Sequence, residues 1–455
     1  MKRFFPRICI LVFVCTHLST STPAATANQE SHLPLTLSDA IIMAVDQNPR
    51  ITAAHDQLEI SASKITQAQS GFYPQVYFSE TFNRTTNPTW AFGTKLNQGV
   101  ITLEDFNPNK LNDPEAINNF GTAFALDWSV FNGGRTRLGT KQSRENHQAA
   151  SLMLKRTRQD VIANTASAYV GLLLARKNVN VVQKALTTAQ AHLKLVQSRF
   201  KSGFVVKSDL LRAQVRIAEL EQERLQAESQ VKMSQAVLHA AMGTFGERSI
   251  NPITPLERCW ESKGSIEEWI AMALGNRPDL KQLRHRQTIA QDEMTKSRYE
   301  HLPTLNLVGT YQINSENFSE FADNYTVGAV ARINLFSGHR ISSKTKEAMA
   351  FLRLVQSTIK AMELGVRVET QKAFLQTQSA WKQIQVAQTA VTQAEEALRI
   401  VRNRYKSGLL TIVSLLDAEV ASQQARTRHF KSMHDYKVAR INLALAAGTI
   451  DTDFQ

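Results

Sequence analysis

Two long stretches of the chain carry apolar residues at alternating steps of three and four positions. In the first stretch they are Val179, Val182, Leu186, Ala189, Leu193, Val196 and Phe200, and in the second Ile384, Ala387, Val391, Ala394, Leu398, Val401 and Tyr405. Such a 3.5-residue period is typical of helices that pack as coiled coils. Because about 135–200 and about 340–405 contain no proline, each stretch predicts one helix of roughly 100 Å, at about 1.5 Å per residue.

The two stretches belong to a repeat that covers most of the chain. The segment Arg199–Phe204 returns 205 residues later as Arg404–Leu409, and the same shift places Phe131–Arg135 on Phe336–Arg340. A unit of about 200 residues is too long for a solenoid repeat and predicts a pseudo-symmetric fold of two halves. We therefore divide the mature chain into a first repeat at 28–250 and a second at 251–455, and expect function where they meet.

Shorter helices are expected alongside the long ones. Proline or glycine bounds each of them: 49–74, 278–303, 203–243 and 408–448. One of the first two segments and one of the last two, placed end to end, together nearly match the length of one long helix. Thr36–Asp39 and Ser265–Glu268 both read as capping boxes, in which the hydroxyl and the acid satisfy free backbone amides. These boxes are separated by 229 residues rather than 205, so the first half has a surplus of 24 residues between Pro74 and Phe131.

Ahead of each long helix the apolar period changes from 3.5 to 2. In the second half the apolar positions are Tyr325, Val327, Ala329, Ala331, Ile333 and Leu335, and small or polar residues alternate with them. Four strands are expected, at about 75–84, 121–132, 304–314 and 323–336. Strands of about ten residues with one apolar and one polar face are the signal of a membrane β-barrel. A soluble sheet with one face on a helical core is the alternative.

The number of strands has a consequence if the sheet lies in lipid. Four strands cannot close a barrel, and an open sheet edge in lipid would leave backbone groups unpaired at a cost of several kcal/mol each. Other subunits must then complete the sheet. A dimer would supply eight strands and a trimer twelve.

The N-terminus predicts export from the cytoplasm. Three basic residues precede a short apolar run that ends at Cys15, and Ala25–Ala27 supplies a small-x-small cleavage site, so we expect residues 1–27 to be a signal peptide. The apolar run is much shorter than the roughly 20 residues of a membrane-spanning helix. A lipid anchor is not expected either, because Cys15 follows Val14 rather than a small residue.

Composition excludes several functions. Removing residues 1–27 takes away three basic residues and lowers the formal net charge from +13 to +10. The basic residues are spread along amphipathic segments rather than clustered with aromatic ones, so no nucleic-acid partner is expected. Cys259 is the only cysteine after the signal peptide, which excludes an internal disulfide and a cysteine-rich zinc site. No spacing indicates a metal site, a cofactor or a catalytic nucleophile.

Together the signal peptide, the duplicated order of helix, β-hairpin, long helix and short helix, and the paired Ser-Gly-hydrophobic turns resemble the TolC-type outer membrane efflux family. The resemblance covers nearly all of the mature chain. It implies a mainly α fold with a trimeric twelve-stranded membrane β-barrel, four strands per protomer, and a periplasmic coiled-coil tunnel. The implied partners are two further copies of the chain, outer membrane lipid, a periplasmic adaptor and an inner-membrane transporter of the RND, ABC or MFS type. The channel itself would catalyse nothing. A periplasmic adaptor protein with a coiled-coil hairpin is the alternative function.

The resemblance also assigns a role to the two repeated turns. Gly203 with Phe204, and Gly408 with Leu409, match turns at the periplasmic tip, where family members meet the adaptor. The minimal interpretation is that each glycine caps a long helix through a left-handed backbone conformation. Adaptor docking is expected in addition.

A second group of residues matches the family's tunnel entrance. Ser414 and Asp417 fall on a constriction where many members place two acids, so this chain keeps one acidic ring, which would favour cations. Asp209 and Tyr405 match positions whose hydrogen bond holds the entrance closed, and Arg212 is the repeat equivalent of Asp417. The alternative roles are an exposed acid near a helix start for Asp417 and core packing for Tyr405.

Two further features concern the strands. Asp127 and Arg332 are equivalent in the repeat and fall on the polar faces of their strands, so we expect them to line the lumen of a barrel; a pair between them is conceivable. The surplus of the first half, at roughly 83–120, contains Asn-Pro and Asp-Pro and is expected to form an external loop that partly covers the mouth.

Overall fold

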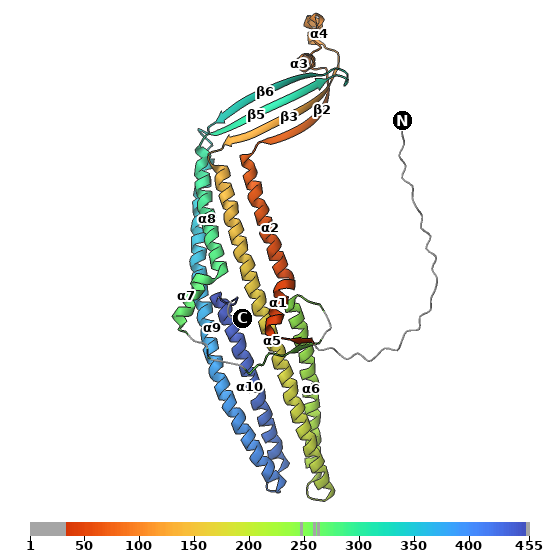
Figure 1. Cartoon of the computed structure of the whole chain (residues 1–455), viewed down its shortest axis with the longest axis vertical. Helices are drawn as coiled ribbons and strands as arrows, with labels where there is room; N and C mark the ends of the chain where they lie inside the picture. The colour runs from red at the N-terminus through yellow and green to blue at the C-terminus, as the bar shows by residue number, and fades with distance from the viewer. Residues whose placement is uncertain (1–32, 246–248, 258–260, 262–263, 452–455) are drawn as a thin grey trace, which may run out of the picture.

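The computed structural model describes residues 33–245, 249–257, 261 and 264–451. Figure 1 shows a sheet at one end of an elongated molecule and a long array of helices that continues to the other end. The expected signal peptide at 1–27 and Cys259 lie outside the described residues.

Two helices of equal length determine the long dimension. They are α5 (Arg135–Lys201) and α9 (Arg340–Lys406), each of 67 residues, which confirms the prediction from periodicity and the absence of proline. None of the helices in the described part of the chain combines the length and the apolarity needed to cross a membrane.

Shorter helices cover both long helices from the sheet to the tip (Figure 1). They are α1 (Leu37–Gln47), α2 (Pro49–Gln69) and α6 (Lys207–Met242) in the first half, and α7 (Ile266–Asn276), α8 (Pro278–Arg298) and α10 (Ile412–Ala447) in the second. Near the sheet α5 packs against α2 and α8, and towards the tip it packs against α6 and α10. Both expected capping boxes are formed, by Thr36 with Asp39 and by Ser265 with Glu268.

The joints between stacked short helices are closed by glycines with left-handed backbone conformations. Gly243 ends α6 with a φ of 76°, and a Cβ there would lie 2.6 Å from the Cα of Asn48 at the start of α2. Gly448 ends α10 in the same way and lies against Arg277, which precedes α8. The Asn48 side chain donates through Nδ2 to the carbonyl of Ala241 at 2.8 Å. The two halves therefore use a glycine with the same backbone conformation at equivalent joints between stacked helices.

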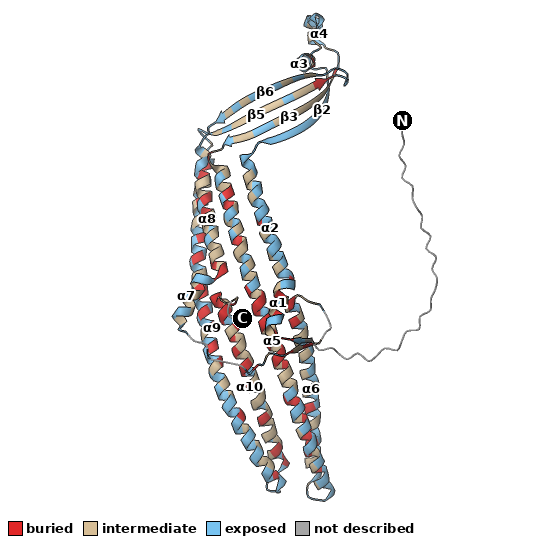
Figure 2. Ribbon diagram, viewed as in Figure 1, coloured by how far each residue is buried: buried red, intermediate tan, exposed pale blue. Residues whose placement is uncertain are grey.

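The best-packed core surrounds these joints, midway along the molecule (Figure 2). One cluster of buried residues joins α1, α5 and α6, and a second joins α5 to α10. Tyr169 is completely buried in this core; its hydroxyl donates to the carbonyl of Leu35 at 2.7 Å and accepts from the amide of Thr254 at 3.1 Å. Leu35 is the last residue of the short strand β1 (Leu33–Leu35), which pairs in parallel with β4 (Ile250–Pro252), and Thr254 follows β4. This pair links the first described residues of the chain to its middle.

Four antiparallel strands form the end sheet in the order β2-β3-β5-β6. They are β2 (Gln75–Thr85), β3 (Ile117–Phe131), β5 (Thr304–Ser315) and β6 (Ala322–Arg332). Two ends differ from the expected ranges by more than one residue. β3 begins before position 121 because β2 continues to Thr85, which pairs with Ile117. β6 ends before position 336 because its partner β5 begins at Thr304, opposite Arg332, so later residues have no strand to pair with.

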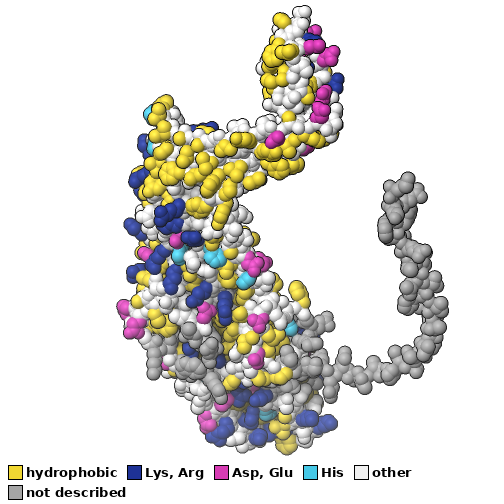
Figure 3. Space-filling model, turned by 45° about the horizontal axis from the view of Figure 1, so that its top comes forward, with side chains coloured by type: hydrophobic (Ala, Val, Ile, Leu, Met, Phe, Trp, Pro, Cys, Tyr) yellow, Lys and Arg dark blue, Asp and Glu magenta, His cyan; other side chains and the backbone are white. Residues whose placement is uncertain are grey.

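The two faces of this sheet differ in chemistry. One face carries exposed large apolar side chains in rows across the strands, such as Phe78, Phe124, Tyr311 and Tyr325. The opposite face carries mainly small or polar residues, together with Tyr77 and Val308, and the apolar face also carries Glu80 and Asp323. Hydrophobic side chains accordingly gather over the sheet in Figure 3. The helical array does not cover either face (Figure 1), so the sheet is not the wall of a soluble helical core, which was the alternative from the sequence.

The joint at Gly243 leads to a stability prediction. Alanine at Gly243 and at Gly203 should each cost about 1–2 kcal/mol of backbone strain, because both φ angles are positive. At Gly243 the added Cβ also collides with backbone atoms, whereas nothing lies within 4 Å at Gly203. We therefore expect Gly243→Ala to lower the free energy of unfolding by about 1–3 kcal/mol more than Gly203→Ala, measured by denaturant unfolding of the detergent-solubilised protein. Equal losses would contradict this account of the joint.

Candidate functional site

The end of the molecule opposite the sheet consists of two helical hairpins with matching turns. Gly203 and Gly408 both have a φ of 77°, and nothing lies near either Cα where a side chain would begin. The amides of Phe204 and Leu409 donate back to the carbonyls of Arg199 and Arg404, at 2.9 and 3.0 Å, which closes each long helix with the bond pattern of a Schellman motif. The Phe204 and Leu409 side chains are 81% and 73% exposed. Each turn therefore presents one apolar side chain to its surroundings.

Tyr405 lies inside the core of this tip rather than at its surface. It is 3% exposed and belongs to a cluster with Val196, Ala213, Ile412 and Leu415. Burial raises the pKa of the Tyr405 hydroxyl; the positive charge of Arg199 opposes this effect and the negative charge of Asp209 adds to it. Tyr405 therefore packs in the core, which is the alternative role that we considered for it from the sequence.

The hydrogen bond expected between Asp209 and Tyr405 is absent. Asp209 is half-buried in the first turn of α6. The Tyr405 hydroxyl is buried without a hydrogen-bond partner among the described residues, so this contact does not form within one protomer. The guanidinium of the neighbouring Arg199 lies over the tyrosine ring, 5.1 Å from its centroid.

Arg199 is the tip residue that the sequence did not indicate. Its Nη1 donates to the carbonyl of Tyr405 at 3.1 Å and its Nη2 donates to the carbonyl of Lys406 at 2.7 Å. It therefore joins the end of α5 to the end of α9. The repeat equivalent Arg404 is exposed and makes no such contact among the described residues. The only sequence signal was the repeated turn motif itself, which contains both arginines and does not distinguish them.

The remaining entrance residues lie on the first turns of the short helices. Asp417 is exposed on the second turn of α10, and Ser414 is half-buried one turn before it, with its hydroxyl 3.4 Å from that of Thr411. Arg212 is exposed on α6. The structure thus places Ser414, Asp417, Asp209 and Arg212 at the same end of the molecule, near the two turns, without direct contacts among them.

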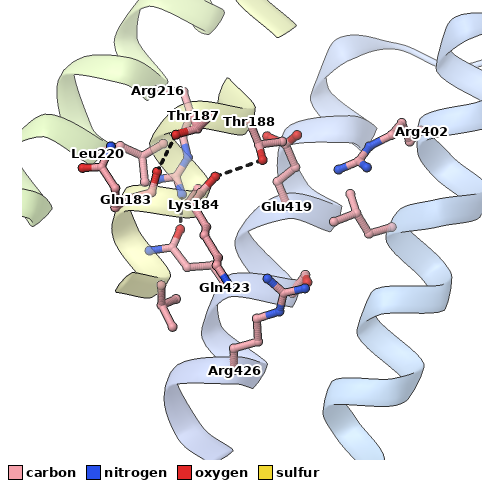
Figure 4. Close-up of a pocket in the computed structure, with 14 residues that line it drawn as sticks. Gln183, Lys184, Thr187, Thr188, Arg216, Leu220, Arg402, Glu419, Gln423 and Arg426 are labelled. Atoms are coloured by element: carbon pink, nitrogen blue, oxygen red, sulfur yellow. Dashed lines mark hydrogen bonds between the residues drawn. The ribbon is translucent and has the colours of Figure 1, made fainter. Parts of the chain in front are cut away.

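Polar contacts also hold the two hairpins together above the tip. The His192 Nε2 on α5 lies 2.8 Å from Glu419 on α10. One turn further from the tip, Arg216 on α6 donates to Gln423 on α10 at 2.6 Å, and Gln423 donates back to Glu223 at 2.6 Å. Figure 4 shows several of these side chains between the pale ribbons of the two hairpins. The hairpins are therefore linked by hydrogen bonds, by the contact of His192 with Glu419, which is an ion pair when the histidine is protonated, and by the apolar cluster around Tyr405.

Asp127 and Arg332 lie on the polar face of the end sheet, as expected, and both are exposed. They do not pair. β5 separates their strands, and Asp127 lies opposite Val308 whereas Arg332 lies opposite Thr304. The possible pair between them was therefore wrong for a single protomer.

The surplus segment of the first half is folded rather than a bare loop. Between β2 and β3 it forms α3 (Pro88–Asn97) and α4 (Pro108–Asn112). Just after α3, Gln98 is 5% exposed and donates to the carbonyl of Asn118 at 2.8 Å and to the side chain of Asn119 at 2.9 Å. Asn119 in turn donates to Asn314 at 3.0 Å, on the polar face of the sheet. The segment therefore rests on the polar face at the outer edge.

An ion pair also stabilises this segment. Lys95 on α3 lies 2.7 Å from Asp105. The hydrogen bond from Lys95, with further bonds from Thr102, lowers the pKa of Asp105 to about 2. The acid is consequently ionised throughout the neutral range, and α3 is linked to the turn that follows it.

Comparisons with known proteins agree with this arrangement. Among curated proteins, the alkaline protease secretion protein AprF of Pseudomonas aeruginosa is 23% identical over 93% of this chain and 86% of its own length. The outer membrane protein TolC of Vibrio cholerae is 22% identical over 99% of this chain and 96% of its own. The protein CyaE of Bordetella pertussis is 22% identical over 92% and 86% of the two chains.

Solved structures show the same fold. The outer membrane channel CmeC of Campylobacter jejuni superposes with a TM-score of 0.78 at 17% identity and covers 91% of this chain and 85% of that one. The outer membrane protein VceC of Vibrio cholerae gives a TM-score of 0.75 at 19% identity, with 90% and 96% covered. The family model described as outer membrane efflux protein matches residues 40–244 and 269–449, in both halves of the repeat. The chain therefore belongs to the outer membrane efflux protein family, whose members are channels of the outer membrane, and not to the periplasmic adaptors.

Proposed function

We propose that three copies of this chain form an exit duct through the outer membrane, as part of a tripartite efflux or type I secretion system. The main support for this proposal comes from the end sheet. Most of its large apolar side chains are on one face and most of its small or polar ones on the other, which is the pattern of a wall between lipid and a water-filled lumen. Its outer strands β2 and β6 have open edges in one protomer, so a lipid-embedded wall requires neighbouring copies to complete the pairing.

In this proposal twelve strands form the barrel and the helices continue it as a tunnel in the periplasm. Asp127 and Arg332 line the lumen. The segment with α3, which rests on the polar face of the sheet, narrows the outer mouth. The duct is passive and has no catalytic residues, and selection of the cargo belongs to an inner-membrane transporter of the RND, ABC or MFS type.

The periplasmic entrance is at the tip. Three copies of Asp417 around the threefold axis form one acidic ring, with Ser414 on the same helix, and Asp209 and Arg212 belong to the neighbouring hairpin. Opening requires the hairpin of α9 and α10 to move away from that of α5 and α6. Arg199 opposes this movement because it bonds to two carbonyls at the end of α9. Tyr405 supports the closed arrangement by packing, with its ring beneath the Arg199 guanidinium.

The turns are the docking points for a periplasmic adaptor. Phe204 and Leu409 are the exposed apolar side chains there, and the adjoining Gly203 and Gly408 leave the space beside them open. The two turns differ in the size of the apolar side chain, so an adaptor hairpin meets two similar but unequal contacts in each protomer.

The proposed duct is tested by recording from the purified protein in planar lipid bilayers. Wild-type protein should migrate as a heat-modifiable trimer and form channels that prefer cations. Asp417→Asn should remove most of this preference and weaken block by divalent cations, because the ring loses three negative charges. Asp46→Asn, which removes an exposed acid far from the tip, is the control. A soluble monomer without channel activity would refute the proposal, and an unchanged preference in Asp417→Asn would refute the ring.

Adaptor docking is tested at the two glycines. Gly203→Glu and Gly408→Glu should abolish export while trimers still reach the outer membrane, because a charged side chain fills the open surface beside Phe204 or Leu409. Gly203→Ala and Gly408→Ala carry the same backbone strain, about 1–2 kcal/mol, without the charge, and should retain most export. The measurements are cargo export, outer-membrane fractionation and copurification of the adaptor. Normal export by both glutamate variants would contradict docking at these turns.

The repeat supplies a matched pair of variants for the entrance. Arg199→Gln removes two bonds from a charged donor, worth about 1.5–3 kcal/mol each, so it should raise the open probability of single channels about tenfold or more. Arg404→Gln makes the identical change at the equivalent position of the other hairpin, which lacks these contacts, and should leave gating unchanged. An equal effect of the two substitutions would show that general tip charge, and not the Arg199 contact, controls opening.

A further inference from the structure

A cavity of about 450 Å³ lies between the two hairpins, above the tip. We call it the inter-hairpin cavity and define it by Lys184 on α5, Arg216 on α6, Arg402 on α9, and Glu419, Gln423 and Arg426 on α10. All four helices of the two hairpins therefore contribute to its wall. Figure 4 shows Arg402 directed from its helix towards the side chains of the opposite hairpin.

Positive charge dominates this wall. Lys184, Arg216, Arg402 and Arg426 line it, against the single acid Glu419. Arg426 is held by Glu395, with nitrogen to oxygen distances of 2.8 and 2.7 Å, and Glu419 Oε1 lies 2.8 Å from the Nε2 of His192 without forming a hydrogen bond. Lys184 and Arg402 have no acidic partner among the described residues. Two cations thus remain uncompensated, one from each hairpin.

Two guanidinium nitrogens of the residues that line the cavity are buried without a hydrogen-bond acceptor among the described residues. Arg216 is 8% exposed; its Nη2 donates to Gln423 and its Nη1 to Glu219 at 3.2 Å, but its Nε is buried without a partner. The Nε of Arg402 is also buried without a partner. A guanidinium has five N–H donors in a fixed plane, and buried donors of this kind are normally satisfied. The residues of the wall are therefore not fully hydrogen-bonded within the protomer, and this also holds for the Oε1 atom of Glu419.

We propose that the inter-hairpin cavity binds a small soluble polyanion that carries carboxylate or phosphate groups. The planar guanidinium matches these oxyanions better than other ligands, and the volume lies within the range of about 300–1,000 Å³ found for small-molecule sites. Arg402 and Lys184 supply the uncompensated charge of the cavity wall. A ligand held in this way links α5 and α6 to α9 and α10, so its binding favours the packed arrangement of the hairpins.

Calorimetry of the purified full-length protein in detergent tests the site, with citrate and inorganic phosphate as separate probes at low salt. We expect saturable binding of at least one probe, with one site per chain, and comparison of the two probes identifies the preferred oxyanion. Arg402→Gln and Lys184→Gln should each weaken the affinity at least tenfold. Arg399→Gln is the control, because Arg399 lies on the same helix but is bound to Glu396 at 2.8 and 2.7 Å and does not line the cavity.

Thermal unfolding of each variant shows whether it is folded, and Lys184, which is exposed, provides a substitution that should not disturb packing. The absence of saturable binding of both probes by folded wild-type protein would overturn the proposal. Equal weakening by Arg399→Gln and Arg402→Gln would overturn it as well, because binding would then reflect the general charge of the surface.

Discussion

A helix of 67 residues needs partners along its entire length, and this requirement shapes the protein. Neither α5 nor α9 can bury its apolar stripe alone, and no other helix in the described part of the chain is long enough to cover one. Two shorter helices placed end to end provide the cover, but each joint brings two helix ends together in the core. Gly243 and Gly448 allow the close approach there, and Asn48 satisfies a carbonyl at the end of α6. The core around the joints then holds the two halves together.

Because the core around the joints holds the two halves together, the two ends of the molecule can differ in chemistry. One end extends into a sheet whose faces separate apolar from polar side chains. The other end consists of two hairpins joined by the small apolar cluster around Tyr405 and by individual polar contacts, such as His192 with Glu419. Bonds of this kind are weaker and more easily exchanged than the packed core near Tyr169. The main packed core therefore lies in the middle of the molecule, whereas polar contacts that can change partners are concentrated at the tip.

Much of the fold could be predicted from the sequence because it depends on local periodicity. The 3.5-residue repeat and the absence of proline gave both long helices within a residue or two, and alternation gave four strands. The end of β6 could not be predicted, because it depends on where β5 begins rather than on its own alternation, which continues through Ile333 and Leu335. The position of the segment after β2 was also inaccessible, since it depends on an amide chain from Gln98 to Asn314 that joins distant parts of the sequence.

At the tip the residues that the family resemblance indicated lie at the same end of the molecule, but the hydrogen bond between Tyr405 and Asp209 does not form within one protomer. The resemblance pointed to Tyr405 and Asp209, whereas the contact that is made belongs to Arg199. No pattern in a sequence marks a backbone carbonyl as an acceptor, so this partner could be found only in three dimensions. The acceptors have a consequence for substitution at the tip. Since Arg199 donates to main-chain carbonyls, these two hydrogen bonds do not depend on the identity of the side chain at 406, whereas loss of the aromatic side chain at 405 would remove the ring beneath the guanidinium.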